Sequence, residues 1–116
     1  MRIFFRSIMG PDPKNDDFKS YAALGRKPRQ TDPEFLERWR GVSVYDTYRQ
    51  ARKNAQAVNW RIGAWIAELR IPDDAPVRYV GPGPTGHWDL HDVAPEYLRG
   101  CVARSVHGPT TEDLER

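Results

Sequence analysis

Several features that identify particular protein classes are missing from this sequence. Its single cysteine, Cys101, excludes an intramolecular disulfide, and we expect a reducing, cytoplasmic setting. No apolar run approaches the roughly 18 residues that a membrane-spanning helix needs, and Arg6 interrupts the only N-terminal candidate for a secretory segment. We therefore expect neither a membrane protein nor a secreted protein held together by disulfides.

The chain also has little net charge, although its charges are unevenly distributed. Its 116 residues carry a net charge of +2, which is too small to indicate a nucleic-acid-binding protein by itself. However, residues 1–61 carry +6, whereas residues 62–116 carry −4. This asymmetry would allow the basic first half to face an anion.

A glycine-rich loop at residues 81–86 lacks the context of a dinucleotide-binding fingerprint. It matches G-x-G-x-x-G letter by letter, but that motif binds phosphate only where its glycines open a helix. Here Pro82 and Pro84 lie inside the loop, no helical pattern follows, and no Gly-Lys-Ser/Thr sequence is present to form a P-loop. We predict a rigid surface loop.

What the sequence does contain is enough aromatic side chain to build one core. Four Trp, five Tyr and four Phe offer large areas to bury in a chain of one-domain length. Short alternating or aromatic-rich stretches predict six strands, at residues 3–8, 42–45, 64–71, 77–80, 88–90 and 101–106. Capping residues predict three helices, which begin near Asp16 or Asp17, at Asp32-Pro33, and at Asp46 or Thr47, and a single helical turn at 95–98.

The order of these elements predicts the class of fold. Because the helices cluster early in the chain, we predict α+β, with a mixed or antiparallel sheet of about six short strands and three helices. The helix that follows Thr47 should lie on the sheet by its alanine-rich side. We expect a single small domain over residues 1–108 and a polar C-terminal tail at 109–116.

Two polar residues stand out because they interrupt apolar strands. Arg6 is the only charged residue inside the first strand, where it is either an edge arginine that reaches solvent or a cleft arginine that holds a phosphate or carboxylate with its planar guanidinium. Ser43, between Val42 and Val44, is either a tolerated strand hydroxyl or a hydrogen-bond donor positioned at a site.

A second group of candidates lies late in the chain. On a strand, His87, Asp89 and His91 would share a face and offer a ligand set for zinc or another transition metal, although an exposed or loop-capping His-Asp segment explains the same spacing. Glu96, just before the closing strand, is either solvated or a catalytic carboxylate. Glu68, the one acid in a predicted central strand, competes for that role unless it pairs with Arg6 or Arg70.

The order of these features resembles the ADP-ribosyltransferase superfamily. Members have an early strand that carries Arg or His, a second strand that carries Ser or Thr, an alanine-rich helix directly after it, and a late Glu. The corresponding segments here are Phe5-Arg6-Ser7, Gly41-Val42-Ser43-Val44-Tyr45, residues 47–57, and Glu96-Tyr97-Leu98 before the last strand. The resemblance implies an ADP-ribosyltransferase-like fold.

The same resemblance implies a function and assigns roles to residues. It implies an enzyme with nicotinamide adenine dinucleotide (NAD) as substrate and no metal, of the kind found among bacterial toxins, modifiers and phage-defence-related proteins. Glu96 and Ser43 would be catalytic, with Glu96 stabilising the oxocarbenium-like centre as nicotinamide leaves, while Arg6, Ser7 and Tyr45 would bind the dinucleotide. The Glu-x-Glu pair of arginine-modifying members is absent because position 94 is Ala94, so an arginine acceptor is not implied.

Two other classes of function stay open from the residues alone. A non-catalytic binding module would meet nucleic acid or an acidic protein partner with a basic face, accompanied by Trp39 and Trp60. The members of that face are Arg26, Lys27, Arg29, Arg49, Arg52 and Lys53. A structural or interaction protein would instead offer its tryptophan-rich surface to a partner or to a second copy.

Overall fold

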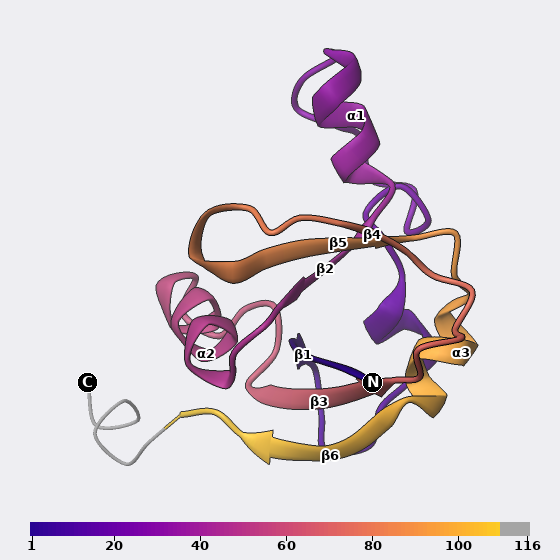
Figure 1. Ribbon diagram of the computed structural model, residues 1–116. Coiled ribbons are helices and arrows are strands. Elements are labelled where there is room, and N and C mark those ends of the chain that lie inside the picture. Colours follow the sequence, from indigo (N-terminus) through magenta and orange to yellow (C-terminus); the bar gives the residue numbers. More distant parts are fainter. Residues whose placement is uncertain (110–116) are drawn as a thin grey trace.

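Within residues 1–109, six strands form one antiparallel sheet in the order β4-β5-β2-β1-β3-β6 (Figure 1). The structure is a computed structural model, and it describes these 109 residues. The strands are β1 (Arg2–Ile8), β2 (Val42–Tyr45), β3 (Trp65–Ile71), β4 (Arg78–Val80), β5 (His87–His91) and β6 (Val102–His107). The predicted α+β class is confirmed, and of the two predicted kinds of sheet the antiparallel one is present. The predicted tail lies outside the described residues, except for Pro109.

Three α-helices and two short 3-10 helices accompany the sheet in the same part of the chain. They are α1 (Pro33–Trp39), α2 (Tyr48–Ala57), α3 (Pro95–Gly100), η1 (Asn15–Phe18) and η2 (Pro84–Gly86). The helix predicted to begin near Asp16 is only η1, because the backbone is extended at Lys19 and the Ser20 hydroxyl then accepts from the Ala23 N–H to start a separate turn. The helical turn predicted at 95–98 is α3.

Two of the three helix starts predicted from capping residues are confirmed as α-helix starts. The Asp32 carboxylate accepts a hydrogen bond of 2.9 Å from the Phe35 N–H, and proline follows Asp32 at the first helical position. Of the two candidate caps before α2, the structure uses Thr47, whose hydroxyl accepts from the Gln50 N–H at 3.2 Å. Each cap satisfies an N–H group that the first helical turn leaves without an intrahelical partner.

The helices cover the two faces of the sheet unequally. On one face α2 packs Ala51 and Ala55 against Ile66 of β3, which confirms that the helix lies on the sheet by its alanine-rich side. On the other face η1 and α3 contribute Phe18 and Leu98 to the larger core (Figure 1). β3 is therefore buried on both of its faces, which agrees with its nearly continuous apolar sequence.

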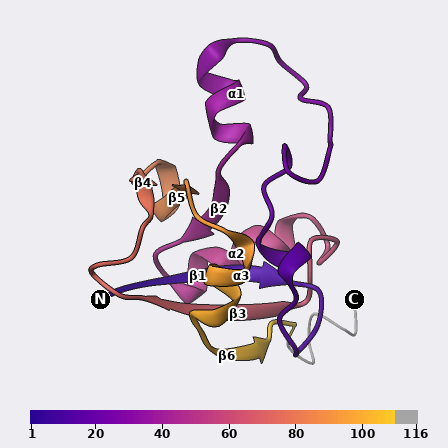
Figure 2. The ribbon, with the colours of Figure 1, turned by 90° about the vertical axis from the view of Figure 1, so that its right-hand side faces the viewer.

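One helix stands apart from this packing. α1 has no buried residue and rises beyond the end of β2, away from the other helices (Figure 2). The chain turns directly from Trp39 through Gly41 into β2. α1 therefore places its aromatic and basic side chains next to the first residues of β2. Within residues 1–109 no helix combines the length and apolar character needed to cross a membrane.

The glycine-rich loop ends in a strand and not in a helix. It contains a cis peptide bond between Gly81 and Pro82, and its last turn, η2, leads straight into β5. Gly86, at φ +73°, lies so close to Asp46 that a Cβ there would be 2.1 Å from the carboxylate oxygen. The loop thus positions the start of β5 against β2, and it does not present a helix terminus for phosphate.

Candidate functional site

The site begins where β1 and β2 separate. The two strands are neighbours in the sheet, but their register consists of one pair, Phe5 with Tyr45, after which they diverge. Arg6 fills the opening: its Nη1 donates to the Ser43 carbonyl at 2.5 Å and its Nε donates to the Asp17 carbonyl at 2.7 Å. A side chain thereby replaces the ladder hydrogen bonds that a closed sheet would make here.

Arg6 is held by neutral acceptors, although it carries a full charge. Among residues 1–109 no carboxylate lies within ion-pair distance of its guanidinium. Burial lowers the pKa of Arg6, and the nearby Tyr21 and Asp17 partly oppose that effect. Arginine nevertheless keeps its proton in proteins. The opening in the sheet therefore contains a positive charge that an incoming anion can neutralise.

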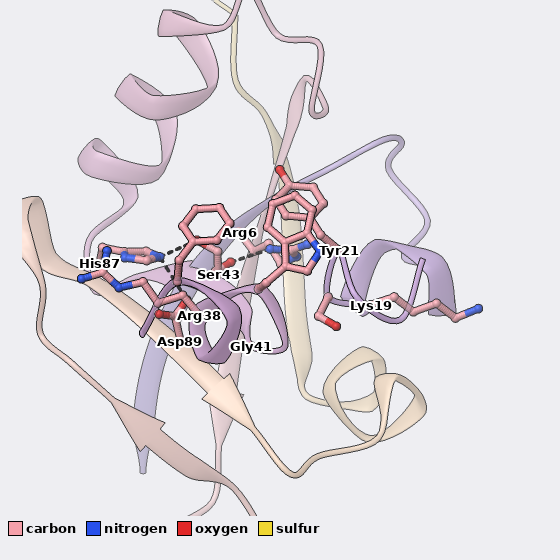
Figure 3. Close-up of a pocket in the computed structure, with 11 residues that line it drawn as sticks. Arg6, Lys19, Tyr21, Arg38, Gly41, Ser43, His87 and Asp89 are labelled. Atoms are coloured by element: carbon pink, nitrogen blue, oxygen red, sulfur yellow. Dashed lines mark hydrogen bonds and ion pairs between the residues drawn. The ribbon is translucent and has the colours of Figure 1, made fainter. Parts of the chain in front are cut away.

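A cavity of about 230 Å³ lies over this opening, and we call it the site cavity (Figure 3). Arg6 and Ser43, the two residues that interrupt apolar strands in the sequence, both line it. α1 and the segment after η1 form its outer wall, and β5 forms the opposite wall. Its lining residues are Arg6, Lys19, Ser20, Tyr21, Phe35, Arg38, Trp39, Gly41, Ser43, His87 and Asp89.

A second, smaller cavity continues from the first. It measures about 80 Å³, and Arg6 and Ser43 line it together with Ser7 and Tyr45. The resemblance assigned three of these residues, Arg6, Ser7 and Tyr45, to dinucleotide binding and Ser43 to catalysis. Burial raises the pKa of Tyr45, with Asp89 as the next contribution, so this phenol stays protonated and can donate a hydrogen bond. We call this space the inner cavity.

Ser43, His87 and Asp89 form a hydrogen-bonded cluster on the wall of the site cavity. The register of β2 and β5 places Ser43 opposite Asp89, and the Ser43 hydroxyl lies 2.6 Å from His87 Nε2. The same nitrogen lies 3.3 Å from Asp89 Oδ1 (Figure 3). A nucleophilic Ser-His-Asp triad requires the acid on the other ring nitrogen, so this cluster is not arranged for serine nucleophile chemistry.

The burial of Asp89 gives this cluster its electrostatic importance. The residue is 6% exposed, and the His87 ring is its close cationic partner when protonated. A carboxylate that is largely buried acts on a positive centre more strongly than one in bulk water. Asp89 is thus the acid that the structure places in the same cavity as Arg6 and Ser43.

Gly41 permits this close packing at the start of β2. A Cβ at Gly41 would lie 2.8 Å from His91 Nε2 and 2.9 Å from the Asp89 Cβ. His91 is 4% exposed, and its Nε2 has no hydrogen-bond partner among the described residues. Its other nitrogen faces Glu37 of α1 at 3.9 Å. A side chain at position 41 would therefore push β5 and its two polar residues away from the site cavity.

The other predicted site residues lie elsewhere. Glu96 is on α3, exposed, with its carboxylate 3.5 Å from the Asn15 amide, and it lines neither the site cavity nor the inner cavity. Its predicted catalytic role therefore finds no support in its position. Glu68, the competing acid, is buried on β3 and accepts from Arg70 at 2.8 Å and from Arg104 at 3.3 Å. The alternative of an ion pair with Arg70 is the one the structure shows.

The metal alternative is not supported by the arrangement of β5. His87 and Asp89 approach each other, but His91 turns towards Gly41 and Glu37. Among residues 1–109 no three His, Cys, Asp or Glu side chains converge in a way that could hold a metal ion. The same three residues therefore serve the wall of the cavity and its packing against α1.

Sequence reasoning missed Asp89 and His87 as partners of Arg6 and Ser43. The available signal is the alternation His-x-Asp-x-His on a predicted strand, for which the sequence leaves two interpretations: a set of metal ligands, or an exposed or loop-capping segment. β5 lies beside β2 only because of the strand order of the sheet, and local sequence patterns do not predict strand order. Comparisons with protein-family models, with curated proteins and with solved structures found no match.

Proposed function

We propose that this domain is an NAD-dependent transferase of the ADP-ribosyltransferase type, with the fold of that superfamily. One observation carries the proposal: Arg6, Ser43 and a buried carboxylate, Asp89, line one cavity at an opening in the sheet. Ser7 and Tyr45 line the adjoining inner cavity with Arg6 and Ser43. The set supplies a cation for a phosphate, hydrogen-bond donors for a ribose or amide, and an anion for a positive reaction centre.

Arg6 has the position and the chemistry to hold the diphosphate of the dinucleotide. Two of its N–H groups are occupied by the carbonyls of Ser43 and Asp17, which fixes the plane of the guanidinium. Its charge has no carboxylate partner within residues 1–109. A guanidinium fixed in this way binds a phosphate oxygen with little loss of rotational freedom. Arg6 therefore acts in ground-state binding.

Asp89 takes the role that the resemblance gave to Glu96. When the bond between nicotinamide and ribose C1′ breaks, its electron pair leaves with the nicotinamide and positive charge develops on the ribose. A buried carboxylate beside that carbon stabilises this charge, and a preorganised group of this kind contributes about 10²–10³ in rate. Asp89 satisfies the requirement because it is buried and lines the site cavity.

The acceptor must lose a proton as its bond to C1′ forms. The Ser43 hydroxyl and His87 Nε2 are 2.6 Å apart on the same wall, so the imidazole can receive that proton directly or through the serine hydroxyl. Nicotinamide leaves as a neutral molecule and needs no acid. The proposed step therefore uses Arg6 to bind, Asp89 to stabilise and His87 to receive the acceptor's proton.

The test is nicotinamide release, measured by chromatography with NAD as substrate. Asp89→Asn should lower the release rate at least 100-fold and change the Kd for NAD by only a few fold, because the lost charge acts mainly in the transition state. Glu96→Gln is the matched control and should behave as wild type. Arg6→Ala should instead weaken NAD binding.

Two results would overturn the proposal. The first is wild-type protein that neither binds nor cleaves NAD with any acceptor offered. The second is loss of release in Glu96→Gln with full release in Asp89→Asn, which would leave the activity but reject the site. Circular dichroism of each variant shows whether a loss of release reflects loss of fold.

A further inference from the structure

A third cavity adjoins the site on the side of the sheet opening away from β5. It measures about 440 Å³, and we call it the arginine cavity because four arginines line it. It shares Arg6 and Tyr21 with the site cavity and Ser7 and Ile62 with the inner cavity. Its lining residues are Arg6, Ser7, Met9, Asp16, Asp17, Tyr21, Leu24, Arg26, Arg29, Val58, Arg61 and Ile62. The proposed transferase mechanism gives this space no role.

Three of the four arginines in this cavity form no ion pair within residues 1–109. Within the described residues, no carboxylate lies in ion-pair distance of Arg26, Arg29 or Arg61, and the one hydrogen bond from the Arg61 Nε goes to the Val58 carbonyl. The two acids of the cavity are already engaged. The Asp17 carboxylate accepts from the backbone N–H groups of residues 9 and 14, and the Asp16 carboxylate pairs with the Lys19 ammonium at 2.7 Å.

A row of aromatic rings leads from the arginine cavity to the site cavity. The Tyr21 and Trp39 ring centroids are 4.8 Å apart, and those of Trp39 and Phe35 are 5.6 Å apart. The Arg26 guanidinium lies over the Tyr21 ring at 5.3 Å, and the Trp39 indole donates to the Arg26 carbonyl at 2.9 Å. Tyr21 is 43% exposed and lines both the site cavity and the arginine cavity, so part of its side chain is accessible where the two cavities meet.

We propose that the arginine cavity binds the backbone of a single-stranded nucleic acid, which is the acceptor of the transferase. The role of the strand as acceptor rests on the proposed function, whereas the binding of the strand rests on the cavity alone. Arginines without acidic partners neutralise phosphates, and exposed rings stack unpaired bases. Both features occur side by side here, with Arg26 belonging to each.

The aromatic row favours a nucleic acid over an acidic peptide. A run of Asp and Glu residues would use the guanidiniums but would leave the exposed part of the Tyr21 side chain without an aromatic partner. The row also favours a single strand, because the bases of a duplex are stacked on one another and cannot reach protein rings. Since Arg6 and Tyr21 line both cavities, a strand in the arginine cavity ends beside the reacting ribose.

The predicted basic face is divided by this arrangement. Arg26 and Arg29 belong to the arginine cavity, and Arg61, which was not predicted, joins them. Arg49, Arg52 and Lys53 are on α2 and do not line that cavity, and the Arg52 Nε donates to the Gly108 carbonyl. This division provides matched variants with equal changes in net charge.

The experiment measures fluorescence anisotropy of labelled twelve-nucleotide oligo(U) and oligo(dT) over a series of salt concentrations, without NAD. The triple variant Arg26→Ala/Arg29→Ala/Arg61→Ala should bind at least 30-fold more weakly than wild type in 50 mM salt. The slope of log Kd against log salt should fall by about 2, because each phosphate contact on a single strand contributes about 0.7. The control variant Arg49→Ala/Lys53→Ala/Arg99→Ala removes the same number of charges and takes its third residue from α3, outside the arginine cavity. It should bind within about threefold of wild type.

Each outcome decides the inference. Equal weakening by both triple variants indicates a diffuse charge effect and overturns the assigned cavity. Absence of binding at low salt overturns the nucleic acid, as does binding of poly-glutamate with an affinity equal to that of the oligonucleotides. Specific binding by a protein that releases no nicotinamide from NAD would support the cavity and reject the proposed function, so the two failures are distinguishable. The RNA and DNA arms show which strand is preferred.

Discussion

β1 pairs along its whole length with one neighbouring strand and at a single position with the other. With β3 it forms seven consecutive antiparallel pairs, from Arg2 with Ile71 to Ile8 with Trp65. With β2 it forms a single pair, Phe5 with Tyr45. β3 contributes Ala67, Leu69 and Ile71 to the larger core, whereas Arg6 of β1 bridges to the Ser43 carbonyl of β2. β1 is thus fully paired along one edge and borders the site cavity along the other.

The comparison shows how a small domain can provide a polar site without losing its core. Backbone N–H and C=O groups need partners when they are buried, and separating two strands would leave such groups unpaired. Arg6 supplies part of what is lost through its bonds to the Ser43 and Asp17 carbonyls. The closed pairing with β3 stabilises the strand, while the opening at β2 makes room for the site cavity.

The largest expected effect is on the free energy of unfolding, and it compares a residue of β3 with a residue of β2. Leu69→Ala, on the closed side, should lower the free energy of unfolding by about 3 kcal/mol, because Leu69 is fully buried in the larger core. Ser43→Ala, on the open side, should lower it by less than about 1 kcal/mol, since it loses one partly exposed hydrogen bond to His87. Urea unfolding of the two variants measures both values, and equal losses would refute the comparison.

A smaller effect is expected at the ion pairs of β3 and β6. The hydrogen bond from Arg70, with a further contribution from Arg104, holds the pKa of Glu68 below its ordinary value. The folded state therefore gains stability from this group above pH of about 4.3 and loses it as the pH falls through the lowered pKa. Glu68→Gln should cost about 1–2 kcal/mol at pH 7.

The pH dependence of the stability loss shows whether Glu68 stabilises the fold through its charge or through its packing. The difference in unfolding free energy between wild type and Glu68→Gln should shrink as the pH is lowered below the ordinary carboxyl range. Nicotinamide release should stay unchanged at pH 7, because Glu68 lines neither the site cavity nor the inner cavity. A constant difference across the pH range would show that shape, and not charge, accounts for the cost.

The fold was largely predictable because its signals are local. Proline after Asp32 and the hydroxyl of Thr47 define two helix starts without reference to the rest of the chain. The alternation in β2 and in β3 likewise predicted both strands to within a residue. The element after η1 was missed because its outcome depends on the Ser20 hydroxyl, which competes with helical hydrogen bonds in a way that periodicity does not capture.

The candidate site was predicted only where it interrupts an apolar pattern. Arg6 and Ser43 are visible in the sequence because they break apolar strands, and they share the site cavity. Asp89 gives no comparable signal, because it reaches the site only through the pairing of β5 with β2. The two strands are distant in sequence: Ser43 and His87, which are in contact, are 44 positions apart. The order of features along the chain predicts Glu96 as the catalytic carboxylate, but in the fold Glu96 lies on α3.

Titration of isotope-labelled protein with NAD, followed by amide chemical shifts, tests the central claim most directly. The account predicts saturable shifts at the three places that line the opening, residues 6–7, 43–45 and 87–89, with little change along β6. The Arg6→Ala variant should lose those shifts while keeping a folded spectrum. Absence of shifts at millimolar NAD, or shifts centred on β3 and β6, would contradict the claim that the opening between β1 and β2 is the dinucleotide site.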